Sequence, residues 1–577
     1  MGTNEYEDYL RKYHETDIYN ISNGAKLPYE IVIDYENLEQ VNSQLADLII
    51  DKSDDCISKF QQAIRNLDVN SHNLLDKYGD EICSIRFKNL SEITPIRELT
   101  AENVGKLIQT KAIINNYSVK HELIPKRAVF ECRSCMRLHE IEQDSKTLIE
   151  PTLCKECGGR SFKLLDDEST YINFKELILS EPLEESDKGN SQKITAIITG
   201  ENEFVGKIRE YGEHGKRINV VGKLRMFKQD NTMYTGLEIN NIWNDNDSSI
   251  ILTDEDINEF KEWAKNDNIL DDLVNKFAPI NAEFDYEIKL ALLCQNVGAG
   301  DLGNNRKEIH IIIVGDAGVG KTTLANVTTN LYEIYQKATG TGSTGAGLIG
   351  AVDRDSINGG WTYQPGKIIL ADGGLAVIDE FDKTNQDDQP KINDIMQDGK
   401  TSIDKADVHV YPKSNVSILA LANPIGTDFD TIHDKIKQID IAGSTLDRFD
   451  GLFILIDKYN SKKHLKIRKK KYQSYKQYND ELEDMEKLKK YLAYVKIEFN
   501  PKFTAESEQE GLYYHNNMIK GYKSSGLQGQ RKHDSLDRFA GAIAKLRQHE
   551  SIEPADVQKA YCIIQYMSKQ IDVELED

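Results

Sequence analysis

The stretch from His310 to Thr323 constrains the fold more than any other part of the chain. Its apolar run, Ile311 to Val314, predicts a buried strand that ends at a glycine-rich loop fitting the pattern G-x-x-x-x-G-K-[ST]. In such a loop, glycines let backbone N–H groups surround phosphate oxygens, the lysine reaches the β- and γ-phosphates, and the hydroxyl binds Mg²⁺. The following helix directs its positive N-terminal end at the same anion. The predicted ATP-binding residues are Gly315, Asp316, Ala317, Gly318, Val319, Gly320, Lys321, Thr322 and Thr323.

A second apolar strand ends in two acids. Leu375 to Ile378 is followed by Asp379 and Glu380. Asp379 is placed to hold Mg²⁺ together with Thr322, and Glu380 is placed to orient or deprotonate an attacking water. A strand followed by a solvated acidic turn is the ordinary alternative, but the order of a phosphate-binding loop first and an acidic strand later favours an ATP site.

The length of 577 residues predicts three or four domains. The net charge of −23 excludes a protein coated in basic surface, although a locally basic ring or groove inside an acidic shell stays compatible with nucleic-acid binding. Residues 1–20 are charged without an apolar core, and no apolar run approaches the ~20 residues of a membrane span. We therefore expect a cytoplasmic, nucleoid-associated protein with no membrane partner.

Four of the eight cysteines form two pairs with the spacing C-x2-C-x18-C-x2-C, which lies within the range of four-thiolate zinc sites. Gly158 and Gly159 after the second pair suit a tight knuckle. Disulfide bonds are the alternative, but an intracellular setting disfavours them. The predicted zinc ligands are Cys132, Cys135, Cys154 and Cys157. Such a closed site is structural and leaves no position for catalysis.

Hydrophobic patterning divides the chain into regions of different type. It predicts a helical N-terminal subdomain (1–98), a β-barrel (99–245) with a zinc-bearing insert (128–162), a linker (246–275), an α/β ATPase core with a mostly parallel sheet (276–457), and a helical region (458–577). Within the barrel, Lys223 to Asn231 predicts a hairpin that carries Arg225 and Lys228. On composition alone, a solvated edge hairpin explains that segment as well as a DNA contact does.

The ATPase core closely resembles the minichromosome maintenance (MCM) helicases of the AAA+ superfamily. The resemblance rests on Thr341 to Leu348, on the string from Leu370 to Lys383, on Leu421-Ala422-Asn423-Pro424, and on Asp447-Arg448-Phe449-Asp450. Outside the core, Ile96 to Leu99, Phe130-x-Cys132 and the seven-residue spacing of Arg531 and Arg538 also match. The family implies an OB-type barrel with a zinc ribbon, an AAA+ P-loop ATPase domain and a helical lid.

The resemblance also implies roles for single residues. Asn423 resembles the polar sensor that positions water against the γ-phosphate, Arg448 the arginine finger that acts on a neighbouring subunit's ATP, and Arg531 the second sensor. Lys405 falls near the tip of the segment that resembles a channel hairpin (401–415), and Arg225 and Lys228 fall on a second one. These three cations would contact DNA phosphates rather than bases.

The family further implies a homohexamer, single or double, that unwinds forked DNA by moving along one strand, with ATP, Mg²⁺ and Zn²⁺ bound and with loading and fork proteins as partners. Three departures stand out: Ala317 replaces the usual proline, Asp447 precedes the finger in place of serine, and His533-Asp534 replaces Leu-Glu. The last segment shows none of the winged-helix pattern that many members carry. An AAA+ ATPase that remodels proteins and a non-catalytic ring subunit or loading scaffold are the alternatives.

Overall fold

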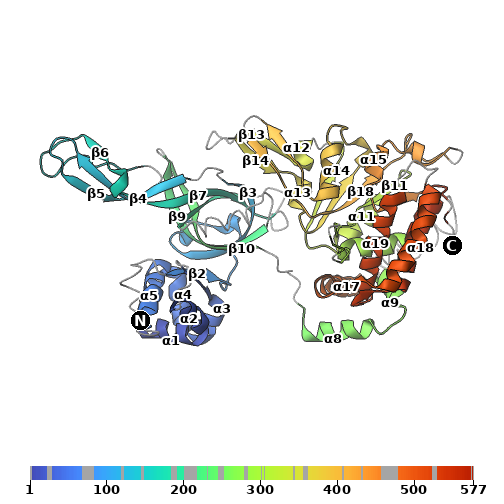
Figure 1. Cartoon of the computed structure of the whole chain (residues 1–577), viewed down its shortest axis with the longest axis horizontal. Coiled ribbons are helices and arrows are strands. Elements are labelled where there is room, and N and C mark those ends of the chain that lie inside the picture. Colours follow the sequence, from blue (N-terminus) through green and yellow to red (C-terminus); the bar gives the residue numbers. More distant parts are fainter. Residues whose placement is uncertain are drawn as a thin grey trace. The chain divides into compact units, whose positions relative to one another are not determined.

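The computed structural model forms two compact units, Met1–Asn246 and Asp247–Asp577, coloured blue to green and green to red in Figure 1. The described residues are 3–22, 29–67, 83–117, 122–143, 148–182, 192–200, 217–229, 232–244, 252–277, 284–300, 302–303, 306–341, 345–354, 361–405, 408–430, 433–456, 478–522, 529–573 and 575.

The first unit begins with a helical bundle, as the sequence predicts. Phe60 and Ile64 lie on one face of α5 and are buried in its core. A parallel pair of strands, β1 and β2, completes this core and was not predicted. The elements are α1 (Thr3–Tyr13), α2 (Glu15–Ser22), β1 (Tyr29–Asp34), α3 (Tyr35–Val41), α4 (Ser43–Asp51), α5 (Ser53–Asn66) and β2 (Cys83–Lys88).

A closed β-barrel follows. Its strands pair in the order β3-β9-β10-β8-β7, and β7 also pairs with β3, which closes the sheet and removes its free edges. Ile114, Ile198 and Leu237 point into a core that is fully buried. The strands are β3 (Leu107–Tyr117), β7 (Thr170–Ser180), β8 (Lys193–Gly200), β9 (Arg217–Gln229) and β10 (Thr232–Asn244). The barrel therefore agrees with the predicted OB-type fold.

A small β-ribbon extends from this barrel. Strand β4 (Glu122–Cys132) pairs with β7 over its first half and with β5 (Leu138–Glu142) and β6 (Phe162–Leu164) over its second half. One continuous strand thus carries the chain from the barrel into the ribbon, whose loops hold the paired cysteines.

The second unit is built on a parallel sheet of five strands in the order β12-β15-β18-β11-β19. Four of them were predicted: β11 (Ile311–Gly315), β15 (Leu375–Asp379), β18 (Ser417–Ala422) and β19 (Gly451–Leu455). These four are almost continuously buried, whereas the edge strand β12 (Tyr335–Thr339) alternates between exposed and buried residues and lacks an apolar run. Helices cover the sheet in Figure 1.

Residues 246–275, expected as a linker that runs into a helix, contain two helices. Phe260, Leu270 and Leu273 from these helices are buried in the large core of the second unit. The acidic composition of the segment obscured its apolar face. The helices that flank the sheet are α8 (Asp254–Trp263), α9 (Ile269–Lys276), α10 (Tyr286–Val297), α11 (Lys321–Thr329), α12 (Gly345–Leu348), α13 (Lys367–Leu370), α14 (Gln389–Asp398) and α15 (Gly443–Leu446).

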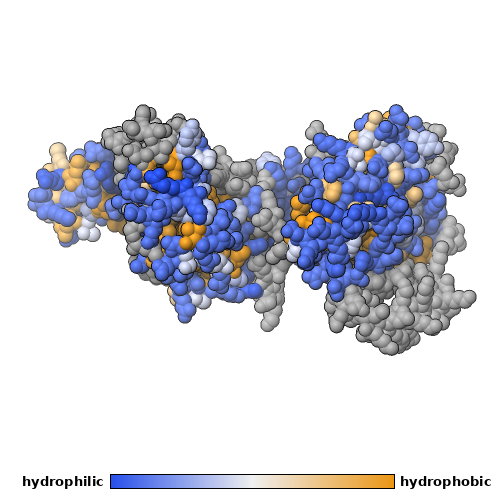
Figure 2. All heavy atoms as spheres, turned by 90° about the horizontal axis from the view of Figure 1, so that it is seen from below, coloured by the Kyte–Doolittle hydropathy of each residue, from blue (hydrophilic) through white to orange (hydrophobic). Residues whose placement is uncertain are grey.

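Four helices form the lid: α17 (Tyr478–Glu498), α18 (Ala505–Tyr522), α19 (Gly529–Leu546) and α20 (Pro554–Gln570), with a short strand pair, β20 (Lys502–Phe503) and β21 (Ser551–Ile552). Leu488 and Leu492 on α17 and Leu536 and Phe539 on α19 are buried on the predicted apolar stripes. Among the described helices, none combines the length and apolar character that crossing a bilayer requires. The face seen in Figure 2 is largely hydrophilic, with apolar residues in small separate patches.

Candidate nucleotide site and cysteine cluster

The strand order brings the predicted ATP-binding residues to one edge of the sheet. Because β11, β15 and β18 are parallel and β18 lies between the other two, their carboxyl ends are adjacent. The loop 315–320 follows β11, Asp379 ends β15, and Asn423 follows β18. This edge, where loops leave neighbouring parallel strands, is where α/β proteins bind ligands.

The loop after β11 has the backbone geometry that its glycines allow. Gly318 and Gly320 have φ values of 84° and 90°, which side chains with a Cβ rarely adopt. The carboxylate of Asp316 accepts a hydrogen bond from the backbone N–H of Phe429 at 2.7 Å, and the N–H of Ala317 donates to the carbonyl of Thr427 at 3.2 Å. The loop is thus fixed to the segment that follows β18.

Lys321, the first residue of α11, is 8% exposed. Its amino group donates hydrogen bonds to the carbonyl oxygens of Gly315 (2.6 Å) and Asp316 (2.8 Å) and to Oδ1 of Asn423 (2.9 Å). Burial lowers the pKa of Lys321, while Asp379 and other nearby acids oppose that shift. Three acceptors hold a desolvated cation at the point where the sequence predicts phosphate.

The residues predicted to bind Mg²⁺ lie side by side. The Thr322 hydroxyl donates to Oδ2 of Asp379 at 3.2 Å. Octahedral Mg²⁺ with ligands at 2.0–2.1 Å places neighbouring oxygens roughly 3 Å apart. A hydroxyl and a carboxylate at this separation therefore fit two adjacent positions around the ion.

Glu380 has a strained backbone, with φ at 53°. Its N–H donates to Oδ1 of Asp379 at 2.9 Å. Its carboxylate accepts a hydrogen bond from the Thr341 hydroxyl and another from the amino group of Lys383 at 2.8 Å. No role was predicted for Thr341 or Lys383. Thr341 is the second residue after β12, a strand that was not predicted, so its position near Glu380 could not be foreseen.

Arg448 lies at the opposite edge of the same sheet. It comes three residues before β19, whose first residue, Gly451, pairs with Ile311 at the start of β11. Five strand residues span roughly 16 Å, so the sheet separates Arg448 from the loop at 315–320 of its own chain. The structure thus divides the predicted ATP residues into two groups at opposite edges.

Arg448 and Arg531 line one pocket of about 330 Å³ together with Gln397 and Asp534. The guanidinium of Arg448 donates to the Ser444 carbonyl at 2.7 Å and to Oε1 of Gln397 at 3.1 Å, and its buried Nε has no partner among the described residues. Burial lowers the pKa of Arg448, and the charge of Arg531 lowers it further. Four arginines and three aspartates line this pocket, so its net charge is positive and it suits an anion.

A buried carboxylate lies next to this pocket. Asp450 is 1% exposed and accepts hydrogen bonds from Arg306 (3.0 Å), Ser535 (3.0 Å), Arg538 (2.8 Å) and the N–H of His310 (2.8 Å). Asp450 thus ties the lid helix α19 to the core strands beside Arg448. Asp450 and Arg538 both belong to motifs recognised in the sequence, but their hydrogen bond was not predicted.

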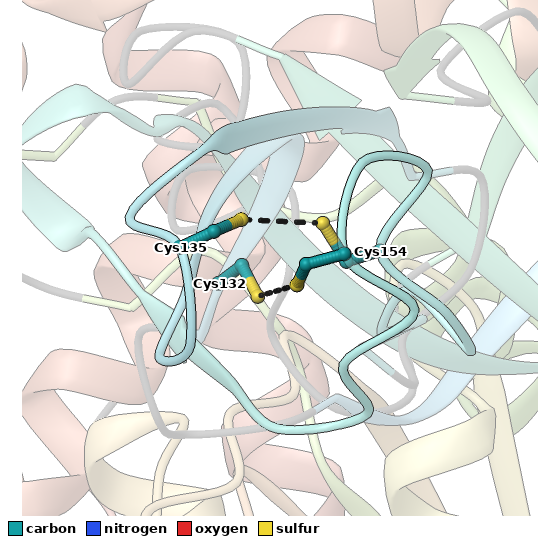
Figure 3. Close-up of side chains that lie close together, drawn as sticks. Cys132, Cys135 and Cys154 are labelled. Atoms are coloured by element: carbon teal, nitrogen blue, oxygen red, sulfur yellow. Dashed lines mark hydrogen bonds between the residues drawn. The ribbon is translucent and has the colours of Figure 1, made fainter.

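The four paired cysteines converge as predicted. Figure 3 shows sulfur atoms from two facing loops directed at one another. Sγ atoms of the four residues all lie within 4.8 Å of one another, with Cys132–Cys157 and Cys135–Cys154 at 3.6 Å. These distances are too long for disulfide bonds, and they match the roughly 3.8 Å between sulfurs around a tetrahedral zinc ion with 2.3 Å bonds.

Two further features lie next to the cluster: His139, which was not predicted, and Gly159, which was expected in a tight knuckle. Nε2 of His139 on β5 lies 3.3 Å from Sγ of Cys154, where an imidazole N–H stabilises a thiolate. A Cβ at Gly159 would lie 3.2 Å from Sγ of Cys157 and 3.3 Å from Sγ of Cys132, so only glycine leaves the cluster uncrowded.

The predicted hairpins are present. Strands β9 and β10 pair from Gln229 and Thr232 downward, and β16 (Ile403–Lys405) pairs with β17 (Val408–Val410), which places Lys405 beside the turn. The side chains of Lys228 and Lys405 lie outside the described residues. Arg225 is 42% exposed by side chain and pairs with Glu238 and Asp54. A third hairpin, β13 (Gly350–Arg354) with β14 (Trp361–Pro365), was not predicted.

This sheet order, with a phosphate-binding loop, an acidic strand end and a helical lid, defines a P-loop ATPase domain of the AAA+ class. Comparison with family models agrees: the MCM P-loop domain matches residues 256–475, the MCM OB domain 95–228 and the MCM AAA-lid domain 486–568. Together these matches cover more than half of the chain. The chain belongs to the MCM family.

Individual relatives are similar over most of the chain. The minichromosome maintenance protein MCM of Saccharolobus solfataricus is 26% identical over 610 residues, covering 100% of this chain and 85% of that protein. DNA replication licensing factor mcm4-B of Xenopus laevis is 27% identical over 546 residues, covering 87% of this chain and 62% of that protein. DNA replication licensing factor mcm5 of Dictyostelium discoideum is 28% identical over 467 residues (76% and 60%). The chain thus spans about three fifths of the length of these eukaryotic relatives.

Proposed function

We propose that this protein is an ATP-dependent DNA helicase whose subunits form a ring, move along one DNA strand and unwind forked duplex. The observation that carries this proposal is the separation of Lys321 and Arg448 at opposite edges of one sheet. A subunit that contains both groups, but cannot bring them together, needs a neighbour on each side. In a closed ring every subunit has a neighbour on both sides, and the family resemblance indicates a ring of six identical subunits.

In this proposal the carboxyl edge of the sheet binds and hydrolyses ATP. Lys321 exchanges its carbonyl partners for phosphate oxygens, and Glu380 orients and deprotonates the attacking water. Asn423, already bonded to Lys321 at 2.9 Å, positions that water against the γ-phosphate. Mg²⁺, when held by Thr322 and Asp379, neutralises charge on the phosphates.

In the same proposal, residues at the amino edge of the sheet act on the ATP bound by the neighbouring subunit. Arg448 acts as a finger that stabilises charge on the neighbour's transferring phosphoryl group, and Arg531 acts as the second sensor. Asp450 positions both the lid and the backbone beside Arg448 through Arg306, whose Nη2 donates to the Arg448 carbonyl at 2.9 Å. Burial and the charge of Arg531 lower the pKa of Arg448, whereas Asp394, Asp398 and Asp447 raise it, so Asp447 is one of three acids that partly offset the charge of the finger.

Residues outside the ATP site, from both units, supply the remaining parts of the proposal. Cys132, Cys135, Cys154 and Cys157 bind Zn²⁺ in a structural site, because four thiolates at these separations leave no open coordination position. Arg225, Lys228 and Lys405 contact DNA phosphates. The pairing of Arg225 with Glu238 and Asp54 implies that DNA must compete with two carboxylates for this side chain.

Strand separation by the full-length protein tests the proposal. A forked duplex with one labelled strand is incubated with ATP and Mg²⁺, beside the variant Lys321→Ala. We expect ATP-dependent unwinding that the variant lacks. ATP hydrolysis stimulated by DNA, without unwinding, would point to a missing loading partner. Hydrolysis indifferent to DNA would favour a protein-remodelling ATPase, and a ring without hydrolysis would favour a scaffold.

A further inference from the structure

A second cavity, of about 390 Å³, lies between the ATPase core and the lid. Its core side is formed by the end of α10 and by residues that precede or begin β11, β15 and β18, such as Glu308, Gly374 and Ser417. It therefore lies at the amino edge of the sheet, away from the loop at 315–320. Lys496 on α17 and Lys545 on α19 line the lid side, and Lys307 lines the core side.

Lys545 is the unusual member of this group. It is only 6% exposed, and its amino nitrogen keeps some accessible surface in the cavity wall, with no hydrogen bond or ion pair to any described residue. Burial lowers the pKa of Lys545 to about 8, and the charges of Lys496 and Lys307 lower it further. A buried ammonium group without a partner is unfavourable, and two neighbouring cations increase the cost.

A neutral donor in the cavity wall also lacks a partner. Tyr332 is 6% exposed, and its buried hydroxyl makes no hydrogen bond to any described residue. Buried polar atoms are nearly always paired in folded proteins, so such an atom beside a cavity indicates a ligand or water. The unpaired hydroxyl and the unpaired lysine therefore point independently to an absent acceptor.

The acids near the cavity do not supply that acceptor to Lys545. Glu308 and Glu333 raise the pKa of Lys496 and so lie closest to that side chain. Neither acid shifts the pKa of Lys545, on which only cations act appreciably. Of the three lysines that line the cavity, Lys545 is the buried one, whereas Lys307 and Lys496 are exposed, so Lys545 depends most on an anion in the cavity.

We propose that this cavity binds a small phosphate-bearing anion, of the size of inorganic pyrophosphate, between Lys545, Lys307 and Lys496 with the Tyr332 hydroxyl as an additional donor. Lysine binds phosphate as a point charge, and the volume falls in the range of small-molecule sites. The site is separate from the ATP site and does not depend on the helicase proposal. An anion held there bridges the core and the lid and stabilises their contact.

Titration calorimetry on the full-length protein tests this site. All proteins carry Lys321→Ala, to weaken phosphate binding at the P-loop, and the probe is inorganic pyrophosphate without Mg²⁺ at constant ionic strength. We expect Lys545→Met to weaken binding by about tenfold or more, since a charge-assisted hydrogen bond contributes on that scale. Lys545→Arg keeps the charge and retains binding. Lys265→Met, which removes an exposed lysine paired with Glu262, leaves the affinity unchanged.

Thermal melting gives an independent readout. Because Lys545→Met removes an unpaired buried charge, it raises the melting temperature without anion and abolishes the further rise that pyrophosphate causes in the parent. Tyr332→Phe provides a second variant that keeps the packing and weakens pyrophosphate binding several-fold. Equal pyrophosphate affinity in the parent, Lys545→Met and Tyr332→Phe would overturn the proposal. So would a Lys545-dependent affinity for a single-stranded oligonucleotide with none for pyrophosphate, which would assign the lysines to a nucleic-acid backbone.

Discussion

Nζ of Lys321 donates a hydrogen bond to Oδ1 of Asn423 over 2.9 Å, joining the loop after β11 to the end of β18. The two residues are separated by 102 positions in the sequence, and the parallel pairing of their strands brings them together. A change in the contacts of either residue therefore affects the other. In the proposed mechanism, phosphate takes the place of the acceptors of Lys321, which frees the Asn423 amide to position the attacking water.

Replacing Asn423 should separate hydrolysis from binding. We expect Asn423→Ala to lower kcat for ATP hydrolysis by about 10²-fold, the scale for losing one oriented polar group at a transition state, with ATP affinity changed only a few-fold. Steady-state hydrolysis and equilibrium binding of a fluorescent ATP analogue measure the two effects. Asn330→Ala, at an exposed position at the end of α11, is the control. A loss of affinity as large as the loss of kcat would show that Asn423 binds rather than positions.

Glu380→Gln should retain ATP and Mg²⁺ but hydrolyse poorly. The amide keeps the size of the carboxylate and can still bond to the Thr341 hydroxyl, yet it cannot accept a proton from water. We expect a fall in kcat of about 10²- to 10⁴-fold, measured by phosphate release. Asp387→Asn removes a nearby exposed acid and should hydrolyse normally. Unchanged hydrolysis in Glu380→Gln would transfer the role of base to another residue.

Mixing two inactive variants should restore activity. Lys321→Ala lacks the phosphate-binding lysine and Arg448→Ala lacks the finger, so each variant alone has no complete site. In rings mixed at equal ratio, about a quarter of the interfaces join an intact P-loop to an intact arginine. Phosphate release should therefore recover to about a quarter of wild type after subunit exchange. Recovery requires action between subunits, and its absence in verified mixed rings would contradict the split site.

The partly buried acid Asp537 should make stability depend on pH. Burial raises the pKa of Asp537 from 3.8 to about 6. Between these values the folded protein binds the proton more tightly than the unfolded chain does, so this group's contribution to stability falls as the pH rises through that window. Asp537→Asn should therefore stabilise the protein at pH 7.5 by about 1–3 kcal/mol. Thermal melts at pH 7.5 and pH 5 measure this gain, which should shrink at the lower pH.

Removing His139 should weaken the metal site without abolishing it. The ring lies 3.3 Å from Sγ of Cys154, and loss of such a supporting contact typically costs 10- to 100-fold in metal affinity. Competition with a chromogenic chelator measures zinc affinity in His139→Ala. Cys154→Ser should lose the metal and destabilise the first unit, whereas Cys562→Ser, at an exposed cysteine of the lid, should keep both metal content and stability.

The sequence predicted those parts of the fold whose signals are local. Buried parallel strands such as β11 and β18 are continuous apolar runs, and the cysteine spacing is a short-range pattern. Strand β12 was missed because its residues alternate in exposure at the sheet edge. The sequence predicted only one helix at the end of the segment 246–275, and the first of its two helices, α8, was missed because five acidic residues accompany a single buried apolar residue, Phe260.

For the site as well, local features were predicted and contacts between distant segments were not. Residues within one motif, such as Lys321 and Thr322, follow from spacing and chemistry. Contacts such as Thr341 with Glu380, or Asp450 with Arg538, depend on how distant elements pack, which no local pattern encodes. The pairing of Arg225 with Asp54 was not predicted for the same reason, because Asp54 lies on α5, 171 positions earlier in the sequence.

The position of Arg448 at one edge of the sheet and of Lys321 at the other has a consequence for stoichiometry. In the proposed assembly each subunit brings two halves of different sites. An open row of subunits would then contain one complete site fewer than it has members, whereas a closed ring would contain as many sites as subunits. Turnover per subunit would then rise with assembly and increase once more when the last gap closes. The catalytic rate per subunit would therefore report what fraction of the subunit interfaces is closed.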